Sequence, residues 1–206
     1  MAASLDGRIG GHSLEGDQER QQIGLSSKED QEYLREQIEL CDAIVVGAGS
    51  IRSNGACLSH PGSGGKYPKW YILAQRAIPD AYEFWRQNEI PRVIISKEPI
   101  PIPSNAVGSI ENLTYGDLHP AEFVYNILEK EGFNIVLLFG GGVINQMFYD
   151  KAMVDELRLT LAPVFIGKSQ APYLIAPELR ETINLSLLEC EAKMDSGFLF
   201  LRYSVN

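Results

Sequence analysis

Short apolar runs rich in β-branched residues recur along the chain, and each has the length of a buried strand. Strands that are covered on both faces of a parallel sheet read as unbroken apolar runs, whereas strands with one wet face alternate. The runs in the middle of the chain therefore predict a parallel sheet. We expect strands at residues 43–46, 70–73, 93–95, 135–139, 157–165, 185–188 and 198–203.

Helical patterns lie between several of these runs. Ser26 and Glu29 have the spacing of a capping box, and apolar positions at helical spacing follow it. A second helix is expected to begin at Pro120, because proline suits the first helical position, and to end at Gly132. A third helix is expected over residues 143–150. Strands that alternate with helices indicate an α/β fold whose sheet is parallel at its centre.

The end of the chain departs from this alternation. No helical pattern separates residues 185–188 from residues 198–203, so the last strands should be antiparallel and should make the sheet mixed. A length of 206 residues is typical of one large domain, and we expect residues 1–206 to form it.

Composition narrows the class of protein. A hydrophobic content of 45% with 22% charged residues indicates a soluble globular protein rather than a disordered one. With 18 basic and 27 acidic residues the net charge is −9, which argues against a nucleic-acid partner, since phosphate is neutralised by clustered lysine and arginine. No apolar stretch approaches the roughly 18 residues of a membrane helix. The first residues lack the basic and apolar regions of a signal peptide.

The cysteines and histidines argue against a metal centre. Cys41, Cys57 and Cys190 are too far apart for a CxxC pair, and the histidines are scattered, so no metal site is expected. Cys41 and Cys190 lie beside apolar residues and should be buried, whereas Cys57 lies in a loop. Unpaired cysteines suit a reducing compartment, so a cytoplasmic location is expected.

Two of the apolar runs lead into glycines. Gly47-Ala48-Gly49-Ser50 follows the first run, and Gly140-Gly141-Gly142-Val143-Ile144 follows residues 135–139. Glycine lets the backbone approach a ligand closely, and N–H groups at the start of a helix attract phosphate oxygens. In an open α/β sheet such turns lie at the carboxyl ends of the strands, where ligands bind. Two of them favour a dinucleotide whose pyrophosphate lies between them, and tight turns without a ligand are the alternative.

Other candidate residues carry weaker signals. Arg52 stands where a dinucleotide fingerprint has its third glycine, and no Walker Gly-Lys-Ser/Thr follows either loop. Arg76 and Ser96 are candidates for holding a ribose phosphate, although side chains of these types usually lie at the surface without a ligand. Asp6 belongs to a turn signal, and Asp30 lies in the first turn of a helix, where a carboxylate ordinarily complements the helix dipole.

Four segments in order resemble the dihydrofolate-reductase-like superfamily and, within it, the pyrimidine-reductase domain of riboflavin biosynthesis. They are residues 3–9 (ASLDGRI), 42–50 (DAIVVGAGS), 139–145 (FGGGVIN) and 154–167 (VDELRLTLAPVFIG). The resemblance spans nearly the whole chain. It implies a three-layer sandwich with a mixed, mainly parallel central sheet and antiparallel C-terminal strands. Family members usually begin with several more strand residues, so either the first strand is short here or the start lies further upstream.

The resemblance implies an NADPH-dependent reductase that passes hydride to C1′ of a ribosylamino-pyrimidine phosphate and opens the ribose to a ribityl chain. The substrate would be 5-amino-6-(5-phosphoribosylamino)uracil or its diaminopyrimidine counterpart. Ser4 and Asp6 would lie near the nicotinamide and the substrate, which makes Asp6 a candidate catalytic residue. A homodimer through residues 157–166 and the C-terminal strands is also implied. The residues that would hold the cofactor are Gly47, Gly49, Ser50, Gly140, Gly141, Gly142, Val143 and Ile144.

The chain departs from this family after the first glycine loop. An acidic pair, a proline and a basic residue are usual there, whereas this chain reads Asn54-Gly55-Ala56-Cys57 and keeps Leu58. Asn54 and Leu58 are therefore candidate substrate-binding residues, together with Ser4. Phe139 replaces the acidic residue that usually precedes the second glycine cluster. Because the missing charges are those expected to grip the pyrimidine and its phosphate, the identity of the substrate stays open.

Two other functions fit the sequence. A dihydrofolate or pteridine reductase of the same fold would use Asp30, which lies about where dihydrofolate reductases place the acid that binds the pterin, although the Trp-x-x-Pro and Gly-Arg-x-Thr loops of those enzymes are missing. Asp30 is therefore the second candidate catalytic residue. A non-catalytic nucleotide-binding protein would keep the glycine loops and lack the residues that bind the substrate. No arrangement of residues fixes NADPH over NADH.

Overall fold

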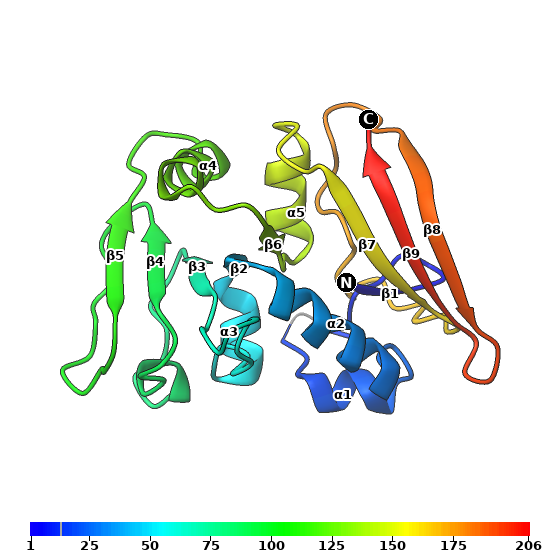
Figure 1. Cartoon of the computed structure of the whole chain (residues 1–206), viewed down its shortest axis with the longest axis horizontal. Helices are drawn as coiled ribbons and strands as arrows, with labels where there is room; N and C mark the ends of the chain where they lie inside the picture. Colours follow the sequence, from blue (N-terminus) through cyan, green and yellow to red (C-terminus); the bar gives the residue numbers. More distant parts are fainter. Residues whose placement is uncertain (13) are drawn as a thin grey trace. The chain divides into compact units, whose positions relative to one another are not determined.

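The computed structural model describes residues 1–12 and 14–206. The chain divides into two compact units, one of Arg35–Gly140 and one that joins Met1–Leu34 to Gly141–Asn206. A sheet forms the centre of each (Figure 1). We call Arg35–Gly140 the parallel unit and the other the mixed unit, after the pairing of their strands. The single domain expected over residues 1–206 stays a prediction.

The parallel unit is built on a five-stranded sheet in the order β5-β4-β3-β2-β6, in which every neighbouring pair is parallel. The inner strands are almost wholly buried, which is why they read as unbroken apolar runs. The predicted parallel sheet is therefore confirmed. Its strands are β2 (Ala43–Gly47), β3 (Lys69–Leu73), β4 (Arg92–Ser96), β5 (Ile110–Thr114) and β6 (Val136–Leu138).

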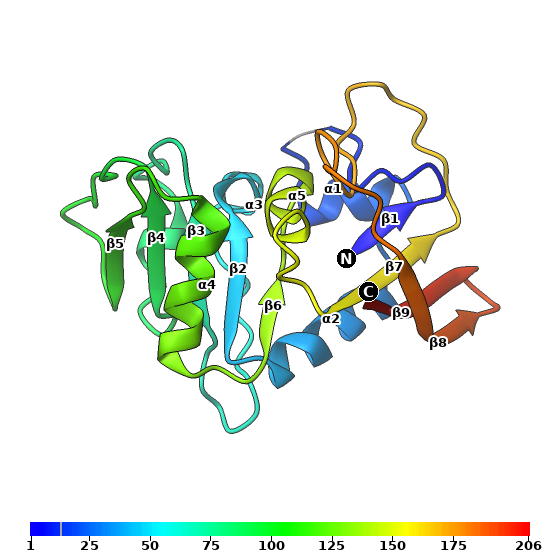
Figure 2. The same ribbon diagram turned by 90° about the horizontal axis from the view of Figure 1, so that it is seen from above.

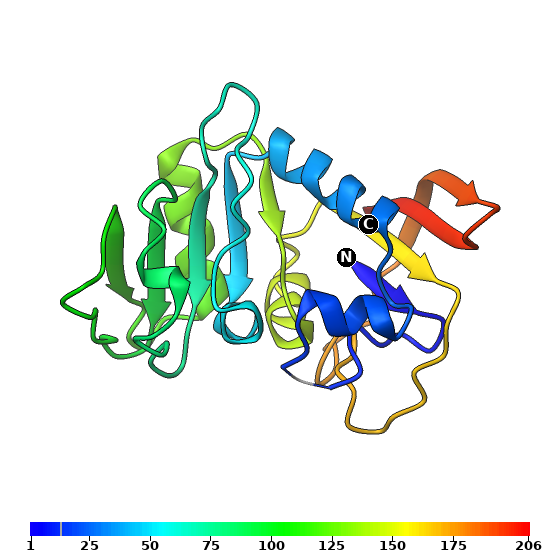
Figure 3. The same cartoon turned by 90° about the horizontal axis from the view of Figure 1, so that it is seen from below.

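Helices cover both faces of this sheet. The views from above and below show α4 (Pro120–Glu131) on one face and α3 (Ala48–Asn54) on the other (Figures 2 and 3). As the sequence predicts, α4 has proline in its first turn and ends where Gly132 takes a left-handed conformation at φ 72°. A short 3₁₀ helix, η1 (Glu83–Trp85), lies in the connection between β3 and β4.

The mixed unit holds a four-stranded sheet in the order β1-β7-β9-β8. β1 (Ala2–Ser4) pairs parallel with β7 (Glu156–Ala162), whereas β9 (Phe198–Val205) is antiparallel to both β7 and the edge strand β8 (Leu185–Lys193). The antiparallel C-terminal strands are therefore confirmed. The helices of this unit are α1 (Asp17–Gln22), α5 (Gly142–Tyr149) and the first turns of α2 (Lys28–Leu40). Among the described residues, no helix has the length and apolar character needed to cross a membrane.

The strand register gives the two faces of the mixed sheet opposite characters. Residues that pair across strands share a face, and side chains alternate along each strand. One face, which we call the charged face, carries the buried residues Ala162, Phe198 and Phe200 together with charged residues, and Arg202 there forms ion pairs with Glu156 and Glu189. The other face is apolar, and its β8 members Leu185 and Leu187 are 40% and 56% exposed. This apolar face comprises Leu157, Leu159 and Leu161, Leu199, Leu201, Tyr203 and Val205, and Leu185, Leu187, Cys190 and Ala192.

Some elements differ from the sequence predictions for identifiable reasons. The edge strand β5 has alternating polar residues and little burial, so its sequence contains no apolar run that would predict a strand. The strand predicted to reach residue 165 ends at Ala162, since Pro163 follows and has no N–H to donate. The first predicted helix is capped by Ser27 rather than by Ser26, because Ser27 Oγ accepts the N–H of Asp30 at 3.1 Å.

The prediction of a buried Cys190 is wrong. Cys190 is exposed on β8, whose apolar neighbours are themselves exposed at the edge of the sheet. Cys41 is buried as expected, and the loop residue Cys57 is buried as well. Apolar sequence neighbours therefore report burial only where a second layer covers the strand.

Candidate functional site

The strand order of the parallel unit creates a place where a ligand can bind. From β2 the chain adds β3, β4 and β5 outward on one side, and then returns to place β6 on the other side of β2. Open α/β sheets bind ligands at such a reversal, outside the carboxyl ends of the strands. The N–H of Phe139 donates to Val45 O at 2.8 Å, so Gly47 and Gly140 leave the sheet at the same edge.

Gly49 has no structural reason to be glycine. It is the second residue of α3, where glycine favours the helix less than alanine does, by at most about 1 kcal/mol. A Cβ built on Gly49 would meet no atom within 4 Å, and its φ is not positive. Neither the conformation nor the packing of the protein requires the missing side chain. Glycine at this position is compatible with the close approach of a ligand to the backbone, as the sequence predicts.

The glycines of the second loop are required by backbone conformation or by packing. Gly141 takes φ 104°, a conformation that other residues rarely adopt. A Cβ on Gly142 would lie 2.4 Å from the carbonyl oxygen of Tyr173, so packing within the mixed unit excludes a side chain there. The N–H groups of Gly142, Val143 and Ile144 begin α5 and make no hydrogen bond to any described residue. They form a positive helix end that suits a phosphate oxygen.

Two arginines lie close together beside the first loop. Arg52, in the last turn of α3, donates to the carbonyl oxygen of Arg76 at 2.7 Å. Partial burial, together with the charge of Arg76, lowers the pKa of Arg52. No carboxylate among the described residues forms an ion pair with either one. A pair of cations without a counter-ion suits an anionic ligand.

The other candidate residues of the parallel unit show no comparable arrangement for binding a ligand. Ser50 is half-buried, and its hydroxyl makes no hydrogen bond to a described residue. Ser96, 2% exposed, donates its hydroxyl to Glu98 O at 2.7 Å, so this proton is already used within the protein. Asn54 ends α3 and is exposed, and Leu58 is half-buried in the following loop.

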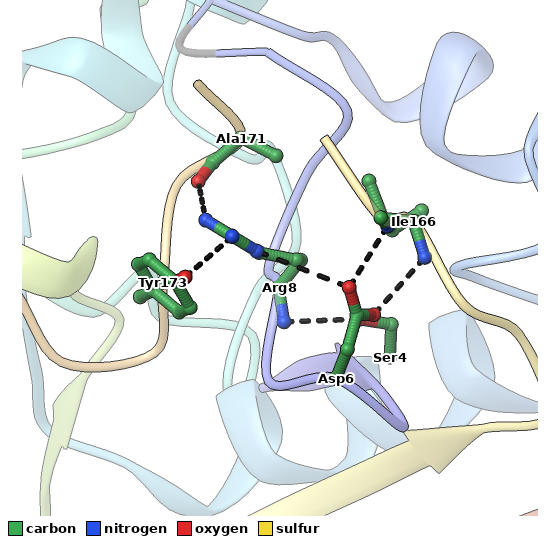
Figure 4. A network of polar contacts seen from close by, with 7 residues as sticks. Ser4, Asp6, Arg8, Ile166, Ala171 and Tyr173 are labelled. Carbon is green, nitrogen blue, oxygen red and sulfur yellow. Dashed lines mark hydrogen bonds and ion pairs between the residues drawn. The ribbon is translucent and has the colours of Figure 1, made fainter. Parts of the chain in front are cut away.

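In the mixed unit the structure brings Ser4 and Asp6 together (Figure 4). Ser4 Oγ donates to the Asp6 carboxylate at 2.6 Å, and the N–H groups of Ile166 and Gly167 donate to it at 3.0 and 2.8 Å. These hydrogen bonds, that of Ser4 first, lower the pKa of the Asp6 carboxyl to about 2. Asp6 is therefore an anion at neutral pH that ties its own turn to residues 166–167.

Arg8 extends this network and was not among the candidates from the sequence. Its guanidinium lies 3.4 Å above the Tyr173 ring, and donates to Tyr173 Oη and to Ala171 O (Figure 4). The residue is 7% exposed, so its charge is held within this network. Arg8 is part of the Ser-Leu-Asp-Gly-Arg segment, but an arginine in a turn has no local pattern that reveals such a contact.

Asp30 is engaged at the start of α2. Its carboxylate accepts the Ser26 hydroxyl at 2.7 Å, while its N–H donates to Ser27. These are contacts of a helix start, where a carboxylate also complements the dipole. The catalytic roles of Asp6 and Asp30 stay predictions.

The strand order and the helices on both faces define an α/β fold, and solved structures share this architecture. A pyrimidine reductase-like protein of Corynebacterium diphtheriae is 20% identical and has a TM-score of 0.79, covering 99% of this chain and 89% of its own. A dihydrofolate reductase of Enterococcus faecalis, complexed with NADP(H) and RAB-propyl, is 12% identical with a TM-score of 0.55, covering 100% and 93%. The predicted dihydrofolate-reductase-like fold is confirmed.

The family follows from the sequence as a whole. The model of the RibD C-terminal domain matches residues 1–198, and the chain belongs to that family. A 2,5-diamino-6-ribosylamino-4(3H)-pyrimidinone 5′-phosphate reductase of Aquifex aeolicus is 27% identical over 180 residues, which cover 85% of this chain and 80% of that protein. The resemblance found in the four sequence segments is confirmed at the level of the family.

We expect the two loop glycines to respond oppositely to alanine. Gly142→Ala should lower the free energy of unfolding by about 1–3 kcal/mol, because the new Cβ overlaps the carbonyl oxygen of Tyr173. Gly49→Ala should leave it unchanged or raise it by up to about 1 kcal/mol, since alanine favours a helix. Urea unfolding of both variants measures the difference. Equal destabilisation of the two would contradict these assignments.

We expect Asp6 to stabilise the fold in a pH-dependent way. Its pKa is lowered from 3.8 to about 2, so its contribution is complete above pH 3.8 and is lost as the pH falls through 2. Asp6→Asn should be less stable than the wild type at neutral pH, and the difference should shrink between pH 4 and 2. Urea midpoints across this range test it, and a difference independent of pH would argue against an anionic anchor.

Proposed function

We propose that this chain is an NADPH-dependent reductase that transfers hydride to C1′ of a ribosylamino-pyrimidine phosphate of riboflavin biosynthesis. The observation that carries the proposal is Gly49, a glycine that neither backbone conformation nor packing requires. It follows β2, where the strand order reverses, in a chain of the RibD C-terminal domain family. The Aquifex aeolicus relative carries the name of such a reductase. The corresponding substrate class here is 2,5-diamino-6-ribosylamino-4(3H)-pyrimidinone 5′-phosphate or its uracil counterpart.

The residues present fit a dinucleotide cofactor. In the parallel unit, Gly47, Gly49 and Ser50 would hold it at the carboxyl end of β2, with Gly140 at the end of β6. In the mixed unit considered by itself, the N–H groups of residues 142–144 have no partner among the described residues and suit a phosphate oxygen. When bound, NADPH supplies the hydride, and the protein supplies position and exclusion of water.

The preference for NADPH over NADH is proposed from the arginine pair. The two cofactors differ by a 2′-phosphate, whose charge needs a cation that is not already neutralised. Arg52 and Arg76 have no carboxylate partner among the described residues, and Arg76 is exposed at the carboxyl end of β3. A guanidinium binds a phosphate through parallel hydrogen bonds. We therefore assign the preference for NADPH to the side chain of Arg76. Arg52 holds the backbone of Arg76 through the hydrogen bond to its carbonyl oxygen.

On the substrate side, Ser4 and Asp6 would act through position and charge. Asp6 stays ionised at neutral pH, so it can orient polar groups of a substrate but is not suited to donate a proton. Asn54 and Leu58, which belong to the parallel unit, remain the other candidates for contact with the pyrimidine. No observation favours the pteridine alternative, because the Asp30 carboxylate already accepts the Ser26 hydroxyl.

We also propose that the protein is a homodimer in the cytoplasm. The apolar face of the mixed sheet leaves Leu185 and Leu187 exposed at β8, and a second copy of the same face would bury them. A two-fold axis makes such an apolar face complementary to itself. Cys190 lies on this face as a free, exposed thiol, a state that a reducing compartment preserves.

The direct test is binding followed by turnover. Nicotinamide fluorescence should report tighter binding of NADPH than of NADH, and NADPH should be oxidised when the ribosylamino-pyrimidine phosphate is added. Gly49→Ala should weaken NADPH binding by about tenfold or more, roughly 1.4 kcal/mol, without loss of stability. Oxidation by dihydrofolate instead would support the pteridine alternative. Binding without turnover would support a non-catalytic role, and binding of neither cofactor would reject the reductase.

Arg76 provides the test of selectivity. Arg76→Gln should weaken NADPH binding by about tenfold and leave NADH binding unchanged, because only the 2′-phosphate loses a charged donor. Arg86→Gln is the matched control, since Arg86 is an exposed arginine of the same unit that pairs with Glu83. Equal loss of both cofactors in the Arg76 variant would contradict the assignment.

The dimer has a test with neighbouring residues on opposite faces of one strand. Leu187→Asp should give a monomer, because a carboxylate would be buried in the apolar interface without a partner. Ser186→Asp places the same group on the charged face and should remain dimeric. Analytical ultracentrifugation distinguishes the two. A wild-type monomer, or two variants with the same behaviour, would exclude this face as the interface.

A further inference from the structure

The loop after α3 is held by a side chain rather than by strand pairing. Around Cys57 the backbone is irregular, so its polar groups have no ladder partner. The side-chain amide of Gln87 pairs with both backbone polar groups of Cys57. Its Oε1 accepts the Cys57 N–H at 2.8 Å, and its Nε2 donates to Cys57 O at 2.9 Å. The Cys57 side chain is 4% exposed, and burial raises the pKa of its thiol. The amide of Gln87 thus fixes the course of this loop as a neighbouring strand would.

Gln87 belongs to a segment that contacts the same loop at further points. The N–H of Phe84 donates to Gly55 O at 2.8 Å. Tyr82 Oη donates to Arg52 O at 3.2 Å, near the end of α3. Residues 82–87 therefore follow residues 52–57 along their length, and Gln87, itself 8% exposed, is the buried end of that contact.

This segment is anchored to the core of the parallel sheet. Arg92 is 1% exposed at the start of β4, and its guanidinium donates to Ile90 O at 2.9 Å, to Val107 O at 2.6 Å and to Phe84 O. A buried guanidinium with carbonyl partners on separate segments fixes them relative to one another. The position of Cys57 is thereby set from a central strand through Arg92, Phe84 and Gln87.

We propose that Gln87 is a positioning residue for substrate recognition. By holding the backbone of Cys57 it sets where the flanking residues Asn54 and Leu58 stand, and these are the candidates for contact with the pyrimidine. The expected effect on KM rests on the proposed reductase function. The pair of hydrogen bonds between Gln87 and Cys57, which we call the clamp, rests on geometry alone. The side chain of Gln87 forms its hydrogen bonds with Cys57 rather than with the glycines at the carboxyl ends of β2 and β6, so we expect it to affect the substrate and not NADPH.

The test removes the two hydrogen bonds and keeps the shape. Gln87→Met has a side chain of similar length without the amide, and Gln87→Glu keeps an acceptor for the Cys57 N–H. Glu89→Met is the control, since it places methionine at an exposed position of the same segment. Amide hydrogen exchange at Cys57, urea unfolding, NADPH binding, and kcat and KM for the ribosylamino-pyrimidine phosphate are measured for each protein.

In Gln87→Met the Cys57 amide should exchange faster, KM should rise by about tenfold to a hundredfold, and NADPH binding should stay within about twofold. Gln87→Glu keeps the acceptor but places a carboxylate oxygen against Cys57 O, so it should not restore the protection or KM of the wild type. Glu89→Met should match the wild type. Unchanged exchange at Cys57 in a folded Gln87→Met protein would overturn the clamp. An unchanged KM alongside faster exchange would overturn the positioning role. A wild type without turnover would instead reject the reductase function, with the exchange result still deciding the clamp.

Discussion

The parallel pairing of β2 with β6 is the contact on which the rest of the parallel unit depends. It places β2 in the interior of the sheet and gives it parallel neighbours on both sides. It also ends two strands at one edge, so that glycines far apart in the sequence leave the sheet together. The expectation of a ligand at this edge rests on the order of the strands, because neither glycine loop has a complete nucleotide fingerprint.

The glycines of the two loops show that one sequence pattern can have several physical origins. Gly142 is fixed by a carbonyl oxygen that packs against it, and Gly141 by its backbone conformation. Gly49 has neither reason, although it sits in a helix where alanine would be more stable. The proposed approach of a ligand to its backbone would account for it, and functional sites often keep local compromises of this kind.

Irregular segments of both units are held by polar side chains that replace missing backbone partners. In the mixed unit the Asp6 carboxylate accepts the N–H groups of residues 166–167, and in the parallel unit the Gln87 amide pairs with both polar groups of Cys57. Buried or half-buried backbone groups need such partners, and a short side chain from a distant segment supplies them. The loops predicted to meet the substrate are thus set by contacts outside themselves.

The sequence by itself determined the central strands, the helix α4 with its proline and glycine ends, the two glycine loops and the Ser4–Asp6 turn, because apolar runs, caps and turns are local patterns. It missed β5, the exposure of Cys190 and the contacts of Arg8, Arg52 and Gln87. A single arginine or glutamine has no local signature, since its partner lies on another segment. Only the tertiary structure decided the strand order, the face on which each residue lies and the partner of each polar side chain, because these depend on which distant segments pair.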